Sequence, residues 1–427
     1  MHFKRIVLLL VIIAVIFSIC GCLKKQEDSR TKIEFWTISL RPTFDDFIHS
    51  LINKYEKENP NIKLIWVDIP YNVLQQKLMS SIAGGVSPDV VNLNTPMAII
   101  LAQHEALVDL NKYLTKEEQE RYFKNLYNAT NIDGSVYALP WYVTTKITMY
   151  NSDIFKKAGL KRPPKNYDEV AQYAKIIKEK TGIYGYMPDM KVMDDFQCDG
   201  IPIVNKDMTK ALFNCPQGVE RLTWYVDLYK QDLIPRETIN LGTAYQTATN
   251  RYQCGELGML ITGANFLLRI KNNAAQVYDL TKVAPMPLGK AHIYPAAVMN
   301  FVIPRASKNR KEAVKFALFM TNDENQLAFC KVVPLLPSTR KAALDEFFIK
   351  GKGMPTEDEA IRISIKELFN SKDLSLALPE RAKLGEYLTD AVQSALVGKK
   401  TPKQALDDAA AQWDKILKIQ ANLRNKK

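Results

Sequence analysis

The sequence predicts an α/β protein divided into two lobes or domains, and three observations support this. At 427 residues, the chain is longer than one hydrophobic core normally supports. Its apolar content of 47% and charged content of 24% are those of a folded globular protein. Beyond the N-terminal segment, β-type and helical patterns alternate, which is typical of a parallel sheet covered by helices.

The first elements follow one another as strand, helix, strand, helix and strand. The strands are predicted at 32–37 ("KIEFWT"), 61–69 ("NIKLIWVDI") and 88–94 ("PDVVNLN"). Between them, residues 42–58 carry apolar side chains at spacings of three and four, which predicts an amphipathic helix. A second helix is predicted over 73–83, where Gly84 and Gly85 end it.

Later segments continue the alternation. A helix is predicted over 167–180, and a strand, turn and helix over 298–320. Near the C-terminus a helix carries one apolar stripe. The stripe is formed by Leu406, Ala410, Trp413 and Leu417.

The N-terminus has the pattern of a secretion signal. Lys4 and Arg5 precede an apolar run from Ile6 to Ile19, which is shorter than the ~20 residues that span a bilayer. The alternative is an uncleaved membrane anchor that extends through Leu23. We expect the signal peptide, because the residues that follow are polar and a globular pattern begins soon afterwards.

The end of the apolar run, "ICGC", resembles the lipobox of bacterial lipoproteins. Cys22 follows the small residue Gly21, whereas Cys20 follows the bulky Ile19, so Cys22 is the expected lipidation site and Cys20 is removed. The expected division is a signal peptide at 1–21 and a polar tether at 22–32. An acylated Cys22 would anchor the protein in the membrane, since each buried CH₂ contributes about 0.8 kcal/mol.

The net charge of +12 invites a nucleic-acid interpretation, which the charge pattern does not favour. Lysines are interspersed with acids along predicted helices and form no basic stripe, so we expect no nucleic-acid partner. An excess of lysine between 399 and 427 is typical of a solvated helix face, with attraction to an anionic membrane as the alternative.

No metal, cofactor or catalytic motif is evident. Cys198, Cys215, Cys254 and Cys330 are isolated, and Cys198 and Cys215 fit either a disulfide or two separate thiols. An acidic cluster, Asp194, Asp195 and Asp199, supplies carboxylates that a glycosidase needs, but no motif frames them and the calcium-loop spacing is absent. We expect a protein without a cofactor or enzymatic activity.

Five segments together resemble the solute-binding lipoproteins of ABC importers, the broad family that includes maltose-binding protein. They are "YEKENPNIKL", "SSIAGGVSPDVV", "ALPWYVTTKITMYNSDIFKKAGL", "GELGMLITG" and "LVGKKTPKQALDDAAAQWDKIL", in that order. The resemblance implies a type II-like periplasmic-binding-protein fold, in which hinge segments cross between two α/β lobes and ligand lies in the cleft.

On this resemblance, the chain crosses between lobes near 142–151, near 298–304 and around 335–338. The first lobe is expected to hold 33–143 and 301–336. The second is expected to hold 144–300 and the C-terminal helical part, 337–427.

Candidate ligand-binding residues come first from the carboxyl ends of the strands, where ligands bind in such sheets. This rule selects Trp36, Thr37, Tyr71, Asn92 and Asn94. The family resemblance also implicates Trp36, Asn92 and Asn94. It adds Trp141, Tyr142, Asn265, Phe266 and Arg381, with Phe266 where many relatives carry a stacking tryptophan. Asp189, after "YGYMP", and Arg41, which opens the first helix, complete the set.

The implied function is the capture of a mono- or oligosaccharide by lobe closure and its delivery to the transmembrane subunits of an ABC permease. Aromatic rings stack on sugar faces, while amides, carboxylates and guanidinium groups pair with hydroxyls. A non-sugar ligand such as glycerol phosphate or a polyamine, or a sensor role toward a membrane kinase, is the alternative. A surface-anchored glycosidase is a further alternative hypothesis. The protein is expected to be a monomer.

Overall fold

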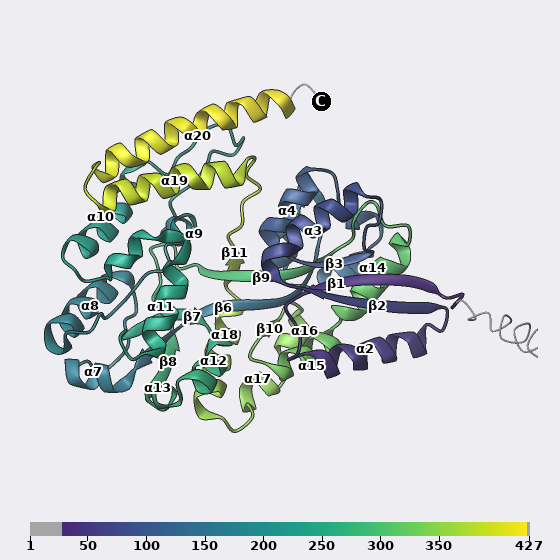
Figure 1. Cartoon of the computed structure of the whole chain (residues 1–427), viewed down its shortest axis with the longest axis horizontal. Coiled ribbons are helices and arrows are strands. Elements are labelled where there is room, and N and C mark those ends of the chain that lie inside the picture. Colours follow the sequence, from purple (N-terminus) through teal and green to yellow (C-terminus); the bar gives the residue numbers. More distant parts are fainter. Residues whose placement is uncertain (1–27, 425–427) are drawn as a thin grey trace, which may run out of the picture.

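The computed structural model describes residues 28–424 and shows two lobes joined by strands that run between them (Figure 1). Lobe 1 is built around β1 (Thr31–Ile38), β2 (Ile62–Ile69) and β3 (Val90–Asn94). β1 pairs with both neighbours in parallel, as predicted. The expected signal peptide, Cys22 and most of the expected tether lie outside the described residues. Within the described part, no helix is long and apolar enough to cross a membrane.

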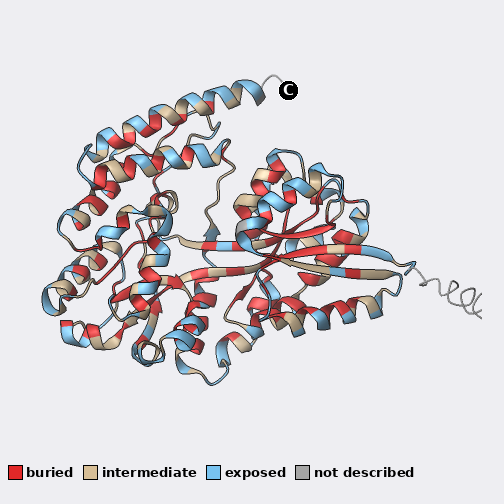
Figure 2. Cartoon of the chain, viewed as in Figure 1, coloured by how far each residue is buried: buried red, intermediate tan, exposed pale blue. Residues whose placement is uncertain are grey.

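Helices cover both faces of the lobe 1 sheet. Successive side chains of β1 point to opposite faces, and apolar side chains on each face must be buried. Ile33 and Phe35 face the core beneath α2 (Asp45–Glu58), whereas Trp36 and Ile38 face α3 (Tyr71–Ala83) and α4 (Thr95–Gln103). The two acidic residues in the first turn of α2 complement its dipole. Figure 2 shows buried positions along the strands and on the inward sides of the helices.

The remaining elements of lobe 1 are short helices, a small hairpin and one helical pair. They are η1 (Leu110–Lys112), α5 (Lys116–Glu120), α6 (Lys124–Tyr127), η2 (Asn128–Thr130), β4 (Asn131–Ile132), β5 (Ser135–Val136), α14 (Arg310–Met320), α15 (Asp323–Val332), α16 (Arg340–Ala343) and α17 (Phe347–Lys350).

Two long strands belong to both lobes. β6 (Leu139–Asn151) pairs with β9 (Tyr294–Val302) as far as Thr145, and from Lys146 onward with β7 (Met259–Gly263) and β8 (Thr281–Pro285) of lobe 2. β9 continues into lobe 1, where it pairs with β3. The chain therefore crosses between lobes at the middle of β6 and at the start of β9.

The third crossing differs from the expected position at 335–338. β10 (Leu336–Pro337) pairs with the lobe 1 half of β6, and Phe348 lies in the lobe 1 core. α18 (Pro355–Leu368) has Leu368 in the lobe 1 core and Ala360 in the lobe 2 core, and β11 (Ser371–Asp373) pairs with the start of β9. Much of 337–368, expected in lobe 2, thus packs on lobe 1, since its apolar side chains complete that core.

Lobe 2 is mostly helical and its C-terminal pair packs as predicted. All four residues of the apolar stripe are buried, and the Trp413 indole N–H donates to the carbonyl oxygen of Leu384, 2.8 Å away. The helices are α7 (Ser152–Ala158), α8 (Tyr167–Thr181), α9 (Val192–Cys198), α10 (Pro216–Lys230), η3 (Arg236–Ile239), η4 (Leu241–Thr243), α11 (Ala244–Gln253), α12 (Phe266–Asn273), α13 (Ala275–Leu280), α19 (Arg381–Leu396) and α20 (Pro402–Arg424).

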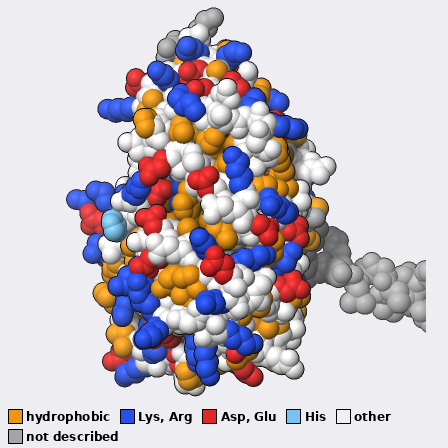
Figure 3. Space-filling model, turned by 90° about the vertical axis from the view of Figure 1, so that its left-hand side faces the viewer, with side chains coloured by type: hydrophobic (Ala, Val, Ile, Leu, Met, Phe, Trp, Pro, Cys, Tyr) orange, Lys and Arg blue, Asp and Glu red, His pale blue; other side chains and the backbone are white. Residues whose placement is uncertain are grey.

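The surface of lobe 2 carries mixed charges. Figure 3 faces this lobe, and basic and acidic side chains are interspersed over it without a stripe of one sign. This face therefore lacks the concentrated basic track that nucleic-acid backbones require.

Candidate ligand-binding cleft

A cavity of about 480 Å³ lies between the lobes. β9 crosses it, and β11 and the loop after it form one side. Lobe 1 contributes the start of α3 and the junction of β3 with α4, while lobe 2 contributes the start of α9 and one face of α19. The lining residues are Tyr71, Asn94, Thr95, Pro96, Met190, Lys191, Val192, Met193, Asp194, Leu241, Pro295, Ala296, Ala297, Val298, Met299, Asp373, Leu374, Ser375, Arg381, Gly385, Leu388, Thr389 and Val392.

The lobe 1 wall is organised by one helix cap. Asn94 ends β3, and its side-chain oxygen accepts a hydrogen bond from the N–H of Met97, which caps α4. Its amide nitrogen donates to the phenolic oxygen of Tyr71, 2.9 Å away. Tyr71 comes just after β2 and is 57% exposed, so its ring offers an open face to a ligand.

The lobe 2 wall carries both signs of charge. Arg381 begins α19, and its guanidinium donates to the carbonyl oxygen of Leu376 at 3.1 Å. Lys191 and Asp194 flank the start of α9. Burial raises the pKa of Asp194 above its ordinary value, although the ammonium of Lys146 lowers it in part. The wall can therefore receive an anionic group or pair with hydroxyls.

The third group of lining residues lies on the crossing strand β11. Burial raises the pKa of Asp373, although its polar neighbours Ser375 and Thr95 lower it in part. The N–H of Ser375 lies 2.9 Å from this carboxyl. The Thr95 hydroxyl also accepts from the amide of Asn300 at 3.1 Å. Asp373 is thus held at the side of the cleft by the N–H of Ser375.

Behind the lobe 2 wall, Lys146 and Asp189 form an ion pair of 2.6 Å. Burial alone would raise the pKa of Asp189, but the adjacent Lys146 ammonium lowers it below its ordinary value. Asp195 accepts a hydrogen bond from Tyr225 at 2.6 Å, and burial raises its pKa to about 6. This network fixes the segment from 189 to 195, whose other side chains line the cleft.

Of the predicted site residues, Tyr71, Asn94 and Arg381 line the cavity. The other residues predicted at strand ends lie elsewhere. Trp36 is 3% exposed under α3, and its indole donates to Glu34 at 2.6 Å. The hydroxyl of Thr37 donates to Asp68, and the amide of Asn92 donates to the carbonyl oxygen of Asn300.

Three further candidates belong to the packing of lobe 1. Trp141 is 1% exposed and stacks on Phe301, with ring centroids 4.5 Å apart. Tyr142 packs on Phe329, and burial raises its pKa. The guanidinium of Arg41 lies 4.0 Å from the ring centroid of Trp66, away from the cavity-lining residues.

The last three candidates lie in lobe 2. Asp189 pairs with Lys146 behind the cleft wall, as described above. Asn265 is exposed at the start of α12. Phe266 is 6% exposed within the lobe 2 core, because its ring is part of the buried face of that helix.

The sequence interpretation did not include the segment 190–194, Asp373, or the face of α19 beyond Arg381. One signal was present, since the acidic cluster that includes Asp194 stood out as a possible carboxylate site. Asp373 carried no signal, because only the pairing of β11 with β9 brings it to the cleft.

Among residues 28–424, no three His, Cys, Asp or Glu side chains are grouped to hold a metal ion. In the same range Cys198, Cys215, Cys254 and Cys330 are free thiols.

Comparisons with known proteins agree with this architecture. The family described as "Bacterial extracellular solute-binding protein" matches residues 50–356, more than half of the chain. A solved structure of a candidate oligosaccharide periplasmic-binding protein from Synechococcus sp. MITs9220 is 30% identical, with a TM-score of 0.83 over 91% of this chain and 99% of that one. The sugar-binding protein MalE from Xanthomonas citri is 20% identical, with a TM-score of 0.77 over 93% of this chain and 100% of that one.

A curated relative has a different named ligand. The sn-glycerol-3-phosphate-binding periplasmic protein UgpB of Escherichia coli O1:K1 is 25% identical over 426 residues, which cover 91% of this chain and 93% of that one. The structural matches confirm the expected α/β periplasmic-binding-protein fold, like that of maltose- and oligosaccharide-binding proteins.

Proposed function

Because the chain belongs to the bacterial extracellular solute-binding protein family, we propose that it captures a carbohydrate, a mono- or oligosaccharide, for an ABC importer. One observation carries this proposal: the cavity is lined from both lobes by an aromatic ring, an amide, carboxyls and a guanidinium group. These are the groups that pair with sugar hydroxyls and stack on sugar rings. The family consists of receptors, in agreement with the expectation that the protein is not an enzyme.

The mechanism is capture by closure around β6, β9 and β11. A ligand that contacts Tyr71 on lobe 1 and Arg381 on lobe 2 stabilises the closed form, because it binds that form more tightly than the open one. One contact already joins the two sides: the Gln103 amide at the end of α4 donates to the carbonyl oxygen of Ala377, 2.8 Å away.

A phosphorylated polyol is the second candidate ligand, and a specific observation favours it. Lys191 and Arg381 place two cations on one wall of the cavity, which suits a phosphate group. The relative named for sn-glycerol-3-phosphate supports the same class.

A thermal-shift screen of the purified protein against neutral mono- and oligosaccharides and glycerol 3-phosphate tests the proposal. Ligand at a hundredfold excess over its Kd stabilises the folded state by about 2.7 kcal/mol, which raises the unfolding midpoint measurably. Tyr71→Ala and Arg381→Ala should each reduce the shift. The matched control is Arg305→Ala, since Arg305 is exposed on lobe 1 and absent from the cavity lining.

The outcomes separate the two ligand classes. A shift with saccharides alone supports the carbohydrate receptor, and a shift with glycerol 3-phosphate alone replaces it with the second candidate. Product formation during incubation with labelled oligosaccharides would contradict a receptor role.

We further propose that the protein is a lipoprotein held at the membrane by Cys22 and delivers its ligand to the transmembrane subunits of a permease. The support is the sequence pattern around Cys22 together with the family. The intact mass of the mature protein checks the anchor, because retention of residues 1–21 would exclude it.

A further inference from the structure

We propose that a second cavity, on lobe 2 and separate from the cleft, binds a single neutral sugar ring. Its volume is about 280 Å³, and it lies between the start of α8, one side of α10 and the loop 288–292. None of the residues that line it also lines the cleft, so the site does not depend on the proposed function of the cleft.

Two aromatic rings form one wall of this outer cavity. Tyr167 and Trp224 are both half-buried, and their planes meet at 86° with centroids 5.8 Å apart. The cleft lining, in contrast, includes Tyr71 but no tryptophan. The outer cavity therefore offers two aromatic rings against which the C–H face of a sugar can pack.

A buried arginine holds these rings in place. The Arg221 guanidinium carbon lies 4.2 Å from the ring centroid of Tyr167 and 4.6 Å from that of Trp224. Arg221 is 6% exposed, and it donates to the Tyr225 hydroxyl at 3.2 Å. The wall is therefore preorganised, which lowers the entropic cost of binding.

The opposite wall is equally close-packed. Gly289 lies against the end of α9, where an added Cβ would approach the carbonyl oxygen of Cys198 to 2.6 Å and the Asp199 carboxylate to 2.5 Å. The backbone N–H of Lys290 donates to Asp199 at 3.1 Å. The loop 288–292 is thus held against the end of α9.

The charges in the outer cavity largely cancel, which favours a neutral ligand over an ion. Arg221 pairs with Asp199 at 3.5 Å, and Lys290 pairs with Glu220 at 2.8 Å. Asp168 remains as an exposed carboxylate at the rim. Asp168 is the one carboxylate beside two ion pairs, so the cavity concentrates neither positive nor negative charge.

Polar groups with free hydrogen-bonding capacity surround the aromatic wall. Within residues 28–424, the side chains of Asp168, Gln217 and His292 make no hydrogen bond to another residue, and all three are exposed at the cavity. A carboxylate, an amide and an imidazole together accept from and donate to hydroxyl groups. Aromatic surface with such polar groups is the chemistry that a sugar ring requires.

The indole N–H signals of the tryptophans provide a direct test by two-dimensional ¹H–¹⁵N NMR. The protein has five tryptophans, and the Trp224→Phe variant identifies the Trp224 signal. The full protein is titrated with D-glucose, D-galactose and maltose. We expect the Trp224 signal to move saturably with at least one of them, and to move equally in a Tyr71→Ala/Arg381→Ala variant whose cleft is impaired.

A rim variant tests the site itself. Gln217→Ala combined with Asp168→Asn should weaken the titration about tenfold, since the first removes an amide and the second replaces a charged acceptor with a neutral amide. The control combines Gln276→Ala with Asp207→Asn, two exposed positions outside the cavity, and should leave it unchanged. The other indole signals report whether each variant is folded.

Three results would overturn the proposal. The first is a Trp224 signal that none of the three sugars moves. The second is a shift that disappears in the Tyr71→Ala/Arg381→Ala variant, which would mean that binding in the cleft causes it. The third is a rim variant that binds as tightly as the unaltered protein. The first two leave the thermal-shift result for the cleft intact, so failure here is distinguishable from failure of the proposed function.

Discussion

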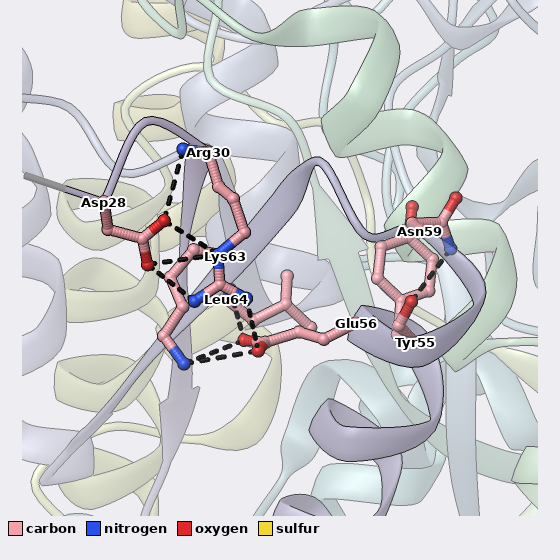
Figure 4. A network of polar contacts seen from close by, with 7 residues as sticks. All are labelled: Asp28, Arg30, Tyr55, Glu56, Asn59, Lys63 and Leu64. Atoms are coloured by element: carbon pink, nitrogen blue, oxygen red, sulfur yellow. Dashed lines mark hydrogen bonds and ion pairs between the residues drawn. The ribbon is translucent and has the colours of Figure 1, made fainter.

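Two ion-pair networks in this protein use similar chemistry, one behind the cleft wall and one nearer the surface of lobe 1. Behind the lobe 2 wall of the cleft, Lys146 and Asp189 are 2.6 Å apart, with side chains 23% and 13% exposed. Just before β1, Arg30, whose side chain is 33% exposed, contacts Asp28 and Glu56, which are 36% and 15% exposed (Figure 4). Burial, rather than the number of charges, should decide which network affects stability and the cleft.

The buried pair should give the largest effect. Lys146→Ala leaves Asp189 without its cation and close to Asp195, so we expect a loss of about 3–5 kcal/mol in the free energy of unfolding. Chemical denaturation measures it. Lys206→Ala is the control, because this exposed residue makes no ion pair within residues 28–424 and should change stability by only about 0.5 kcal/mol. Equal losses in both variants would contradict the comparison.

A buried carboxyl without a cation extends the comparison. Glu367, 4% exposed on α18, accepts from the N–H of Met286, and burial raises its pKa to about 8 from an ordinary value of 4.5. The folded state holds this proton more tightly than the unfolded state does. Stability should therefore fall as the pH rises from about 4.5 to 8, by at most about 1.4 kcal/mol per pH unit from this group.

Glu367→Gln tests this dependence, because it removes the titrating group and keeps the shape. Its free energy of unfolding should vary less with pH across that window than that of the unaltered protein. Glu359→Gln, at an exposed position on the same helix, is the control and should preserve the slope. A slope unchanged in Glu367→Gln would show that other groups cause the pH dependence.

A neutral polar contact at the cleft should have an intermediate effect. Asn94→Ala removes the cap of α4 and the hydrogen bond to Tyr71, and we expect a loss of about 1 kcal/mol in stability. Affinity for the ligand should fall as well, since the Tyr71 ring loses its support. Asn94→Asp retains an acceptor for the cap, and its carboxylate can accept a hydrogen bond from the Tyr71 hydroxyl, so this variant should recover both stability and binding.

The same comparison explains which parts of the cleft the sequence predicts. Asn94 ends β3 and Tyr71 comes just after β2, so the strand-end rule finds both from local pattern alone. Trp36 obeys the same local rule, yet its side chain faces α3, because the sheet is covered on both faces and alternation assigns each position to one of them. The bounds of β1–β3, α2 and α3 were predicted to within a few residues, because these elements depend on such local patterns.

The lobe 2 wall depends on contacts between distant segments. The start of α9, β11 and α19 come together only because β9 and β11 pair and α19 packs over lobe 2. The pairing of Lys146 with Asp189 is similarly non-local, since the two residues are 43 positions apart in the chain. Local sequence patterns do not indicate which distant segments come together, so they do not predict this wall. Arg381 was predicted only because the family resemblance implied it.

The surface network should give the smallest effect. Glu56 accepts from the N–H of Leu64 at 2.9 Å and pairs with Lys63 at 3.1 Å (Figure 4), so it retains partners when Arg30 is removed. Although burial opposes it, these contacts lower the pKa of Glu56 below its ordinary value. Arg30→Ala should therefore leave the thermal midpoint nearly unchanged at moderate salt, where exposed pairs are screened. A midpoint drop comparable to that of Lys146→Ala would show that the entry of the chain into β1, and not burial alone, controls stability.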